Sequence, residues 1–158
     1  MNIEIYADGI TKKEANHDNF SEACRGLVKH NDKYLLVELK KWRIFTMPGG
    51  RREPGEALTD CVEREVLEET GIKVKALEHK VSITEYFIDS VWLIHYFVCE
   101  YISDTNQVAL TDEEINLELV KCWKTEEEVF DIFENTESLH ENGSTIHNRE
   151  FIGFINSI

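Results

Sequence analysis

The chain has few basic residues and a large excess of acidic ones. Its 17 lysines and arginines stand against 31 aspartates and glutamates, which gives a formal net charge of −14. This balance argues against broad binding to DNA, RNA or an anionic membrane, because those partners need basic patches. It does not exclude a small polyanionic substrate, provided that divalent cations lie between the acidic side chains and that substrate.

Paired cysteines and long apolar segments are also absent. The four cysteines lie far apart and form no C-x-x-C pair, so we expect free thiols in a reducing cytoplasm and no zinc site. The N-terminus has no apolar region typical of a signal peptide. The longest apolar run, residues 91–99, is too short to span a bilayer. We therefore expect a cytoplasmic protein with no membrane partner.

The order of apolar patterns and turn signals predicts an α/β protein. We expect strands at 3–6, 24–29, 34–39 and just before Pro48, a helix at 55–70, strands at 72–88, 91–102 and up to Trp123, and helices at 125–135 and from 146 onward. This order favours an α/β/α sandwich with a mixed β-sheet. No linker or repeat divides the chain, so we expect one domain over residues 1–158, with the first 20 or so residues peripheral.

Three glutamates, Glu65, Glu68 and Glu69, crowd the last turns of the helix expected at 55–70. Like charges one turn apart destabilise a helix. At 100° per residue, they share one arc of the helical wheel with apolar side chains, those of Ala57, Leu58, Cys61 and Val62. The opposite side holds Thr59, Asp60, Glu63, Arg64 and Thr70. A solvated charge run would place its acids opposite the apolar stripe, so we expect the three glutamates to face inward.

Carboxylates on an inward face are costly unless something cationic lies among them. Arg64 is the one nearby cation in the sequence, and three acids outnumber it. Clustered oxygen ligands with open coordination positions suit Mg²⁺ or Mn²⁺. The preceding Pro48-Gly49-Gly50 turn exposes backbone groups that can supply a further metal ligand or approach a phosphate. The sequence therefore predicts a divalent metal site, and a metal-free acidic surface patch is the alternative.

The same stretch resembles the signature box of the Nudix hydrolase family, the MutT-like proteins. That box is written G-x5-E-x7-R-E-U-x-E-E-x-G-U, where U is an aliphatic residue. Every fixed position is filled here, by Gly50, Glu56, Arg64, Glu65, Val66, Glu68, Glu69, Gly71 and Ile72. The hairpin before the box, the "MPGG" segment and the strand at Trp123 also resemble the Nudix fold, over residues 22–135.

The resemblance implies a hydrolase that depends on Mg²⁺ or Mn²⁺. The expected reaction cleaves a phosphoanhydride bond of a nucleoside diphosphate linked to another moiety, such as a nucleoside triphosphate, a dinucleoside polyphosphate or a nucleotide sugar. The metal ligands implied are Glu65, Glu68 and Glu69, with the Gly49 carbonyl and with Glu56 in support. Bound metal lowers the pKa of a water and aligns it for in-line attack, while Arg64 orients a box glutamate.

The general base stays open at this point. In some family members it is the glutamate after the box arginine, here Glu65, and in others it is a downstream loop glutamate. Glu113 and Glu114 in "LTDEEINL" are the loop candidates, and solvated loop acids are the alternative reading of both.

Three residues are candidates for contacting substrate: Arg51, Trp42 and Tyr86. Core packing is the alternative for Trp42, and Tyr86 lies near a position where some Nudix subgroups carry discriminating aromatic residues. His95 is expected to be a satisfied core histidine. His147 and Arg149 reach a site only if the last helix folds over it, and surface roles are the default expectation for them.

We expect an enzyme whose partner is a small nucleotide rather than a nucleic-acid polymer, and a homodimer stays an open alternative. A catalytically weak or silent Nudix domain that senses a nucleotide is the second hypothesis. The third is an acidic interaction module with no small-molecule site, which requires the glutamates to be exposed.

Overall fold

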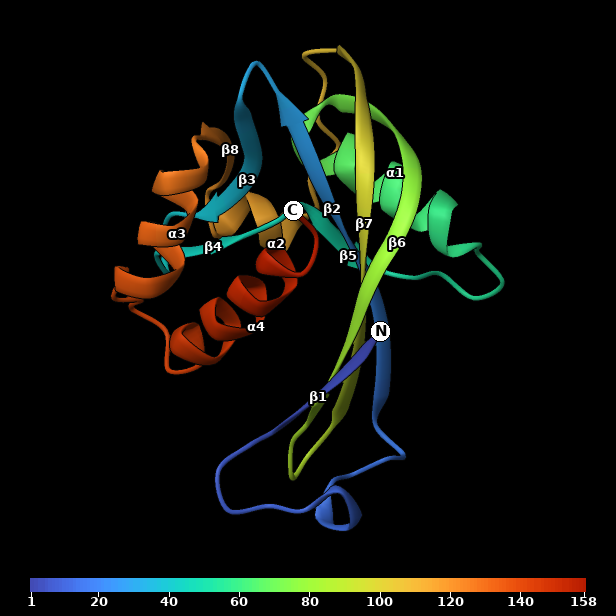
Figure 1. Cartoon of the computed structure of the whole chain (residues 1–158), viewed down its shortest axis with the longest axis vertical. Helices are drawn as coiled ribbons and strands as arrows, with labels where there is room; N and C mark the ends of the chain where they lie inside the picture. Colours follow the sequence, from blue (N-terminus) through green and yellow to red (C-terminus); the bar gives the residue numbers. More distant parts are fainter.

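Eight β-strands form one mixed sheet with helices on both of its faces, as the computed structural model shows for residues 1–158 (Figure 1). The strands are β1 (Asn2–Tyr6), β2 (Phe20–His30), β3 (Lys33–Leu39), β4 (Ile44–Thr46), β5 (Gly49–Arg51), β6 (Ile72–Tyr86), β7 (Val91–Asp104) and β8 (Leu119–Lys124). The helices are the 3-10 turn η1 (Lys12–Glu14), α1 (Leu58–Thr70), α2 (Asp112–Asn116), α3 (Glu126–Asn135) and α4 (Gly143–Ile155). The predicted α/β/α sandwich with a mixed sheet is confirmed.

The strand order is β1-β6-β7-β2-β3-β4, with β5 paired to β2 and β8 paired to β3. The pairs β1–β6 and β2–β7 are parallel, and the other pairs are antiparallel. The N-terminal strand β1 therefore extends the sheet at its edge. The predicted hairpin turn is present between β2 and β3, where Asn31 and Asp32 take positive φ values of 51° and 60°, as tight hairpins require.

Two hydrophobic cores lie on opposite faces of the sheet. One packs α3 and α4 against residues such as Ile83, Ile94 and Tyr96, and the other packs α1 against residues such as Phe97 and Cys99. Because side chains alternate along a strand, neighbouring positions of β7 feed different cores. Figure 1 shows α1 on one side of the sheet and α3 and α4 on the other.

Helix α1 begins at Leu58, three residues later than the sequence pattern predicts. Gly55 has a left-handed φ of 77°, and the Glu56 amide donates to the Glu53 carbonyl, so these residues form a turn rather than a first helical turn. The predicted stop is confirmed, because Gly71 closes the helix with φ 75°. The helix thus starts directly after the loop that carries the glycine-rich segment.

Thr70 is buried, which corrects its predicted place on the outer side of α1. Its hydroxyl donates to the Val66 carbonyl at 2.6 Å. The chain that follows β7 crosses the end of the helix, since the Thr105 amide bonds to Gly71 and the Ala109 amide bonds to Glu68. This crossing segment covers a side that a helical wheel alone assigns to solvent.

Helix α4 folds across the sheet, so the predicted surface roles of His147 and Arg149 are wrong. Their exposed fractions are 2% and 7%. The fully buried Glu150 carboxylate accepts from the Tyr96 hydroxyl at 3.0 Å and from the Met47 amide at 2.9 Å. His147 Nε2 accepts from the Phe45 amide at 2.9 Å. These bonds attach α4 to β7 and to the segment around β4.

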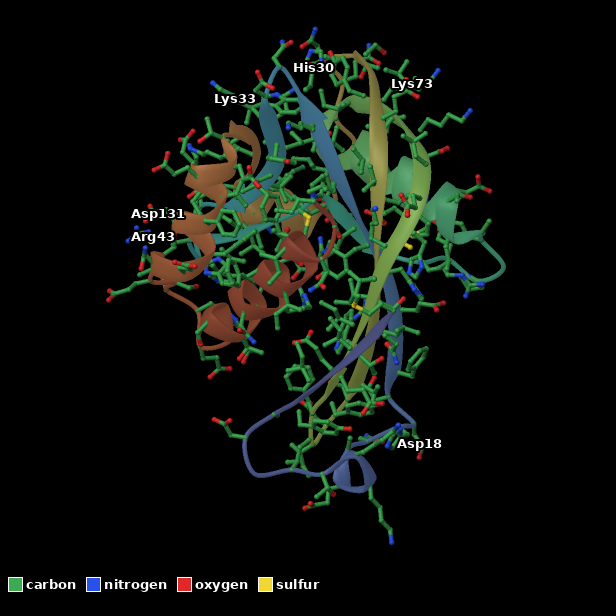
Figure 2. All side chains as sticks on the ribbon, in the orientation of Figure 1. Asp18, His30, Lys33, Arg43, Lys73 and Asp131 are labelled. Carbon is green, nitrogen blue, oxygen red and sulfur yellow. The ribbon has the colours of Figure 1, made fainter.

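Charged side chains cover the outer surface, where Asp18, Lys33, Arg43, Lys73 and Asp131 project away from the sheet (Figure 2). No helix has the length and apolar character needed to cross a membrane.

Gly153→Ala is expected to destabilise the fold by about 1–3 kcal/mol through overpacking. A Cβ at this buried position would meet the Tyr96 ring, with Cζ at 2.6 Å. Helix propensity alone would make the alanine variant more stable by about 1 kcal/mol. A decrease in the free energy of unfolding therefore identifies the packing effect. Urea denaturation measures it, and Asn148→Ala on the exposed side of α4 is the control. A Gly153→Ala protein as stable as the wild type would contradict this packing of α4 on the sheet.

Candidate active site

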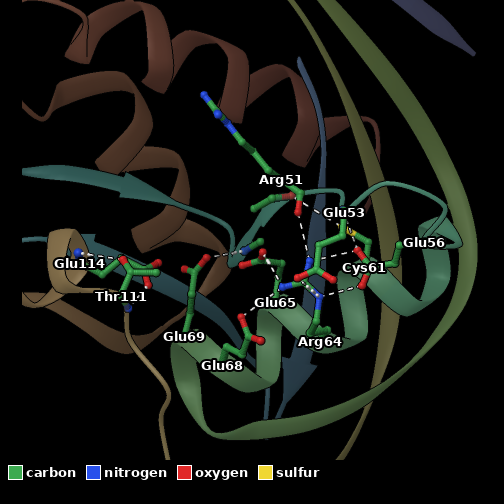
Figure 3. A network of polar contacts seen from close by, with 12 residues as sticks. Arg51, Glu53, Glu56, Cys61, Arg64, Glu65, Glu68, Glu69, Thr111 and Glu114 are labelled. Carbon is green, nitrogen blue, oxygen red and sulfur yellow. Dashed lines mark hydrogen bonds and ion pairs between the residues drawn. The ribbon is translucent and has the colours of Figure 1, made fainter. Parts of the chain in front are cut away.

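Arg64 is the centre of the polar cluster on α1 (Figure 3). Its Nε lies 2.7 Å from one Glu56 oxygen and its Nη2 lies 3.0 Å from the other. Its Nη1 lies 2.9 Å from Glu65 Oε1 and 3.1 Å from Glu68 Oε2. Nη2 also donates to the Arg51 carbonyl at 3.1 Å. The Arg64 guanidinium thus compensates three carboxylates and connects the loop before α1 to the helix. The helical wheel predicts Arg64 on the side opposite the glutamates.

The pKa values of the paired groups follow from this arrangement. The hydrogen bonds from Arg64 lower the pKa of Glu56 from its ordinary value of 4.5 to about 2. The same bonds raise the pKa of the Arg64 guanidinium. Burial raises the pKa of Glu65, and its bond to Arg64 opposes this shift without cancelling it. Glu65 therefore carries less compensation for its buried charge than Glu56 does.

Glu69 is the most buried of the three clustered glutamates, with 5% of its surface exposed. It makes no ion pair within 4.0 Å, and its carboxylate accepts from the Gly49 amide at 3.3 Å. Burial raises its pKa well above 4.5, the Arg25 charge opposes this, and Glu114 and Glu65 add to it. The expected inward placement is thus correct for Glu69, while Glu65 is half-buried and Glu68 is the most open.

The glycine-rich loop passes close to both the sheet and α1. A Cβ at Gly49 would overlap the Cys24 carbonyl, and one at Gly50 would lie 2.5 Å from Glu65 Oε2. Arg25 Nη1 donates to the Gly49 carbonyl at 3.0 Å and to the Met47 carbonyl at 3.2 Å. At Gly49 only glycine permits this approach, because the overlap is with the backbone, whereas at Gly50 the neighbour is the flexible end of Glu65. Arg25 fixes the Gly49 carbonyl, which the sequence predicts as a metal ligand.

The donor set matches a hard divalent cation in its chemistry. Four carboxylates gather at the end of the loop, and burial raises the pKa of Glu65 and of Glu69, so their charged forms are costly without a cationic partner. No three acidic, histidine or cysteine side chains converge in an arrangement that would hold a metal ion. Instead, three of the carboxylates turn toward Arg64.

A cavity of 530 Å³ lies on the α4 side of the sheet and reaches the same loop and helix. Gly49 and Glu69 line one part of it, next to Glu113 and Glu114 of α2. Its size is typical of a small-molecule site. The other lining residues that concern the site are Arg25, Trp42, Glu85, Phe87, Trp92, Ile146 and Arg149.

Glu56, Arg64, Glu65 and Glu68 belong to the Arg64 network and do not line this cavity. Five other predicted site residues do line the cavity: Trp42, Gly49, Glu69, Glu113 and Glu114. Trp42 lines it and lies beside His140, with ring centres 4.4 Å apart. The Arg51 guanidinium lies 4.9 Å from the centre of the Trp92 ring, which also lines the cavity. The Glu114 carboxylate accepts from the Thr111 amide at 2.8 Å in a capping box, whereas the Glu113 carboxylate makes no hydrogen bond within the protein.

Tyr86, predicted as a substrate contact, does not line the cavity, so the structure does not bring it together with the other candidates. It is 5% exposed and stacks on Tyr6 of β1, with ring centres 5.0 Å apart. Side-chain alternation explains the difference, because Glu85 and Phe87 on either side of it line the cavity. His95 is a satisfied core histidine as predicted, with bonds to Ser82 at 2.8 Å and Glu22 at 2.9 Å.

Sequence reasoning missed Arg25 and Glu85, although both carried a signal. Arg25 lies between Ala23 and Leu27 on the core-facing side of β2, and Glu85 continues the face of Ile83 on β6. A charged residue at a core-facing position of a buried strand must find a partner or a ligand. The argument used for the helix glutamates applies equally to these two strands.

Comparison with known proteins identifies the same region. A family model of the NUDIX domain matches residues 22–145. The NAD-capped RNA hydrolase NudC of Salmonella paratyphi C (strain RKS4594) is 36% identical over 90 residues, which are 56% of this chain and 34% of that protein. The match therefore spans about a third of the length of this relative.

Two solved structures share the fold. A NUDIX hydrolase from Nitrosomonas europaea superposes with a TM-score of 0.63 at 19% identity, covering 87% of this chain and 91% of the other. The MutT protein from Methanosarcina mazei Go1 has a TM-score of 0.59 at 18% identity, covering 85% and 94%. At such identities the likeness concerns the fold.

Glu56→Gln is expected to flatten the acid dependence of stability. Because the folded-state pKa of Glu56 is lowered to about 2, its contribution is present above about pH 4.5 and is lost as the pH falls toward 2. The wild type should therefore lose a large part of its advantage over Glu56→Gln as the pH decreases from about 5.5 to about 3, and the rest as it approaches 2. Urea denaturation across this range measures the difference.

The matched control is Glu53→Gln, whose side chain is 67% exposed and lies 4.0 Å from Arg64. That variant should keep the pH profile of the wild type. Parallel profiles for wild type and Glu56→Gln would show that the ion pair with Arg64 does not stabilise the fold.

Proposed function

This chain belongs to the Nudix hydrolase family, and on that premise we propose that it hydrolyses a phosphoanhydride bond in a nucleoside diphosphate linked to another moiety. One observation carries the proposal: a cavity of 530 Å³ is lined by Glu69 and by Gly49. Glu69 belongs to the Nudix box, in which every fixed position is filled, and Gly49 directly precedes that box. The substrate then lies between the sheet and α4, with its phosphates at the carboxylate end.

The reaction we propose depends on Mg²⁺ or Mn²⁺, held by Glu65, Glu68 and Glu69 with the Gly49 carbonyl. Such a cation supplies charge neutralisation for the diphosphate and an activated water. Arg25 keeps the Gly49 carbonyl in place, since its Nη1 donates to that oxygen at 3.0 Å. A carbonyl oxygen has two lone pairs, so this bond leaves one for a metal.

Arg64 has a positioning role in this proposal. It holds Glu56 on the loop and Glu65 and Glu68 on the helix within one set of hydrogen bonds. Without a metal, this guanidinium limits the repulsion among the acids. With a metal, it orients the carboxylates from the side that faces the loop.

For the general base we keep Glu65 and the α2 glutamates, and we favour Glu113. Its carboxylate lines the cavity and makes no hydrogen bond within the protein, so it is free to accept a proton. Glu65 is paired with Arg64, and Glu114 is engaged by the Thr111 amide.

We propose a small nucleotide as the substrate rather than a polymer, because the net charge of −14 disfavours a long polyanion. NudC is named for NAD-capped RNA, and NAD itself contains two nucleotides joined through a diphosphate. That linkage belongs to the class of bond proposed here. The four cysteines are free thiols, which supports a cytoplasmic location and one domain over residues 1–158 that needs no disulfide.

A nucleotide-binding sensor is the second candidate, and a specific observation favours it. Arg64 already engages three carboxylates, and no three side chains are arranged to hold a metal ion. A domain with this arrangement could bind a nucleotide in the cavity without turning it over. Incubation with a broad panel of nucleotides and Mg²⁺ or Mn²⁺ decides between the two, because a sensor releases no phosphate or nucleotide from any of them.

Glu68→Gln and Glu69→Gln are each expected to lower kcat at least about 100-fold, because each removes a carboxylate from the proposed metal site. The loss should be measured in nucleotide turnover at saturating Mg²⁺. Full Mg²⁺-dependent turnover in both variants would show that the metal assignment is wrong.

Glu134→Gln is the matched control, since it makes the same change on the exposed side of α3. It should turn over substrate as the wild type does. Thermal melting of all three variants separates a lost ligand from a lost fold.

A further inference from the structure

Glu85 is a buried carboxylate with one oxygen that no group of the protein engages. It is 2% exposed and lines the cavity. Its Oε1 accepts from Arg149 Nη1 at 3.1 Å, while Oε2 accepts no hydrogen bond. Arg25 Nε is the one sealed side-chain polar atom without a partner, so Oε2 of Glu85 is open to the cavity rather than enclosed.

The neighbouring Glu150 shows what a purely structural buried carboxylate looks like in this protein. Its Oε1 accepts from Tyr96 and Arg149, and its Oε2 accepts from the Met47 amide. Both oxygens are used, as burial of a charge requires. Glu85 departs from this pattern only on the side that faces the cavity.

Arg149 presents donors at the same place. Its Nε and Nη2 bond to Glu150, and its Nη1 bonds to Glu85. A guanidinium has five N–H groups, so two remain after these three bonds, and Arg149 lines the cavity. The pair therefore offers an acceptor and donors side by side, held by a buried network.

Strand register places this pair away from the carboxylates of the box. Glu85 pairs with Trp92, and Trp92 pairs with Ser21 of β2, which lies four residues before Arg25. Four residues of strand span about 13 Å. This span separates the backbone positions, and the Arg25 side chain lies between the two ends, with Nη1 3.0 Å from the Gly49 carbonyl and Nε 3.7 Å from Glu150 Oε1, which Arg149 Nη2 also contacts at 2.9 Å. The Gly49 loop thus marks the phosphate end of the cavity, and Glu85 with Arg149 marks the other end.

Aromatic side chains line the cavity near that end. Phe87 follows Glu85 on the chain, and Trp92 lies directly opposite Glu85 on the same face of the sheet. Flat apolar walls with a few placed polar groups are typical of a site for a planar ligand. A nucleobase has this shape and carries donors and acceptors along its edge.

We propose that Glu85 and Arg149 form a nucleobase-recognition site that selects purines carrying an exocyclic amino group. The open Glu85 oxygen accepts an N–H of that amino group, and an Arg149 N–H donates to the adjacent acceptor atom of the base. This deepens the proposed function, on which the placement of the phosphates rests.

Binding of nucleoside monophosphates tests this without turnover. Two pairs differ in the amino group: GMP against IMP, and AMP against the monophosphate of unsubstituted purine riboside. Calorimetry on the wild type should show at least one amino-bearing member binding roughly 10- to 100-fold more tightly than its partner, as one good polar contact to a base provides.

Glu85→Gln replaces the hydrogen-bond acceptor that faces the cavity with a donor. If the amide oxygen keeps the bond to Arg149, the NH₂ faces the cavity as a donor and opposes the amino group of the base. We expect the preference to fall to within about threefold or to invert. Glu85→Asp retains an acceptor and should keep the wild-type direction, and Glu134→Gln should keep the wild-type ratio.

Equal binding within each pair by the wild type, no binding of any of the four, or an unchanged ratio in Glu85→Gln would overturn the proposal. If Glu85→Gln does not fold, the wild-type ratios and Glu85→Asp still decide. Turnover of nucleotides by wild type without base preference would refute base reading and leave the hydrolase function intact. Base preference without turnover would support base recognition and refute the hydrolase function.

Discussion

The rest of the site depends on the hydrogen bonds made by the buried Glu150 carboxylate. Its carboxylate has no exposed surface and joins α4 to Tyr96 of β7 and to the Met47 amide before the box loop. Removing one partner of such a buried charge costs about 3–5 kcal/mol, so α4 has one strongly favoured position. That position places Arg149 against Glu85 and forms the wall of the cavity.

A second charge balance organises the other end of the cavity. Arg64 compensates Glu56, Glu65 and Glu68 and thereby connects the loop to the helix that follows it. Glu69 has no such partner and lies buried beside the Gly49 amide. The protein therefore holds its acids near one another, and among them Glu69 lines the cavity without an ion-pair partner.

These two networks divide the cavity into ends of different chemistry. Carboxylates and the glycine-rich loop occupy one end, where the proposed function places the phosphates. The other end combines aromatic walls with an open acceptor on Glu85 and donors on Arg149. Arg25 connects both, since it bonds to the Gly49 carbonyl and lies 3.7 Å from Glu150. This division is what the proposed nucleotide hydrolysis and base recognition rest on.

The amino-acid sequence by itself determined the sandwich and the position of the box, because local patterns specify them. Alternating and helical periodicities mark the strands and helices, Gly71 ends α1, and the spacing of the glutamates identifies the metal-binding candidates. Two other features depend on segments that lie far away in the chain. These are the burial of Thr70 on α1 and the burial of Arg149 on α4. The segment after β7 covers Thr70. Tyr96 and Glu85 hold α4 against the sheet through hydrogen bonds to Glu150 and Arg149. Only the tertiary structure decided these points, because the partner of a buried charge is a neighbour in space.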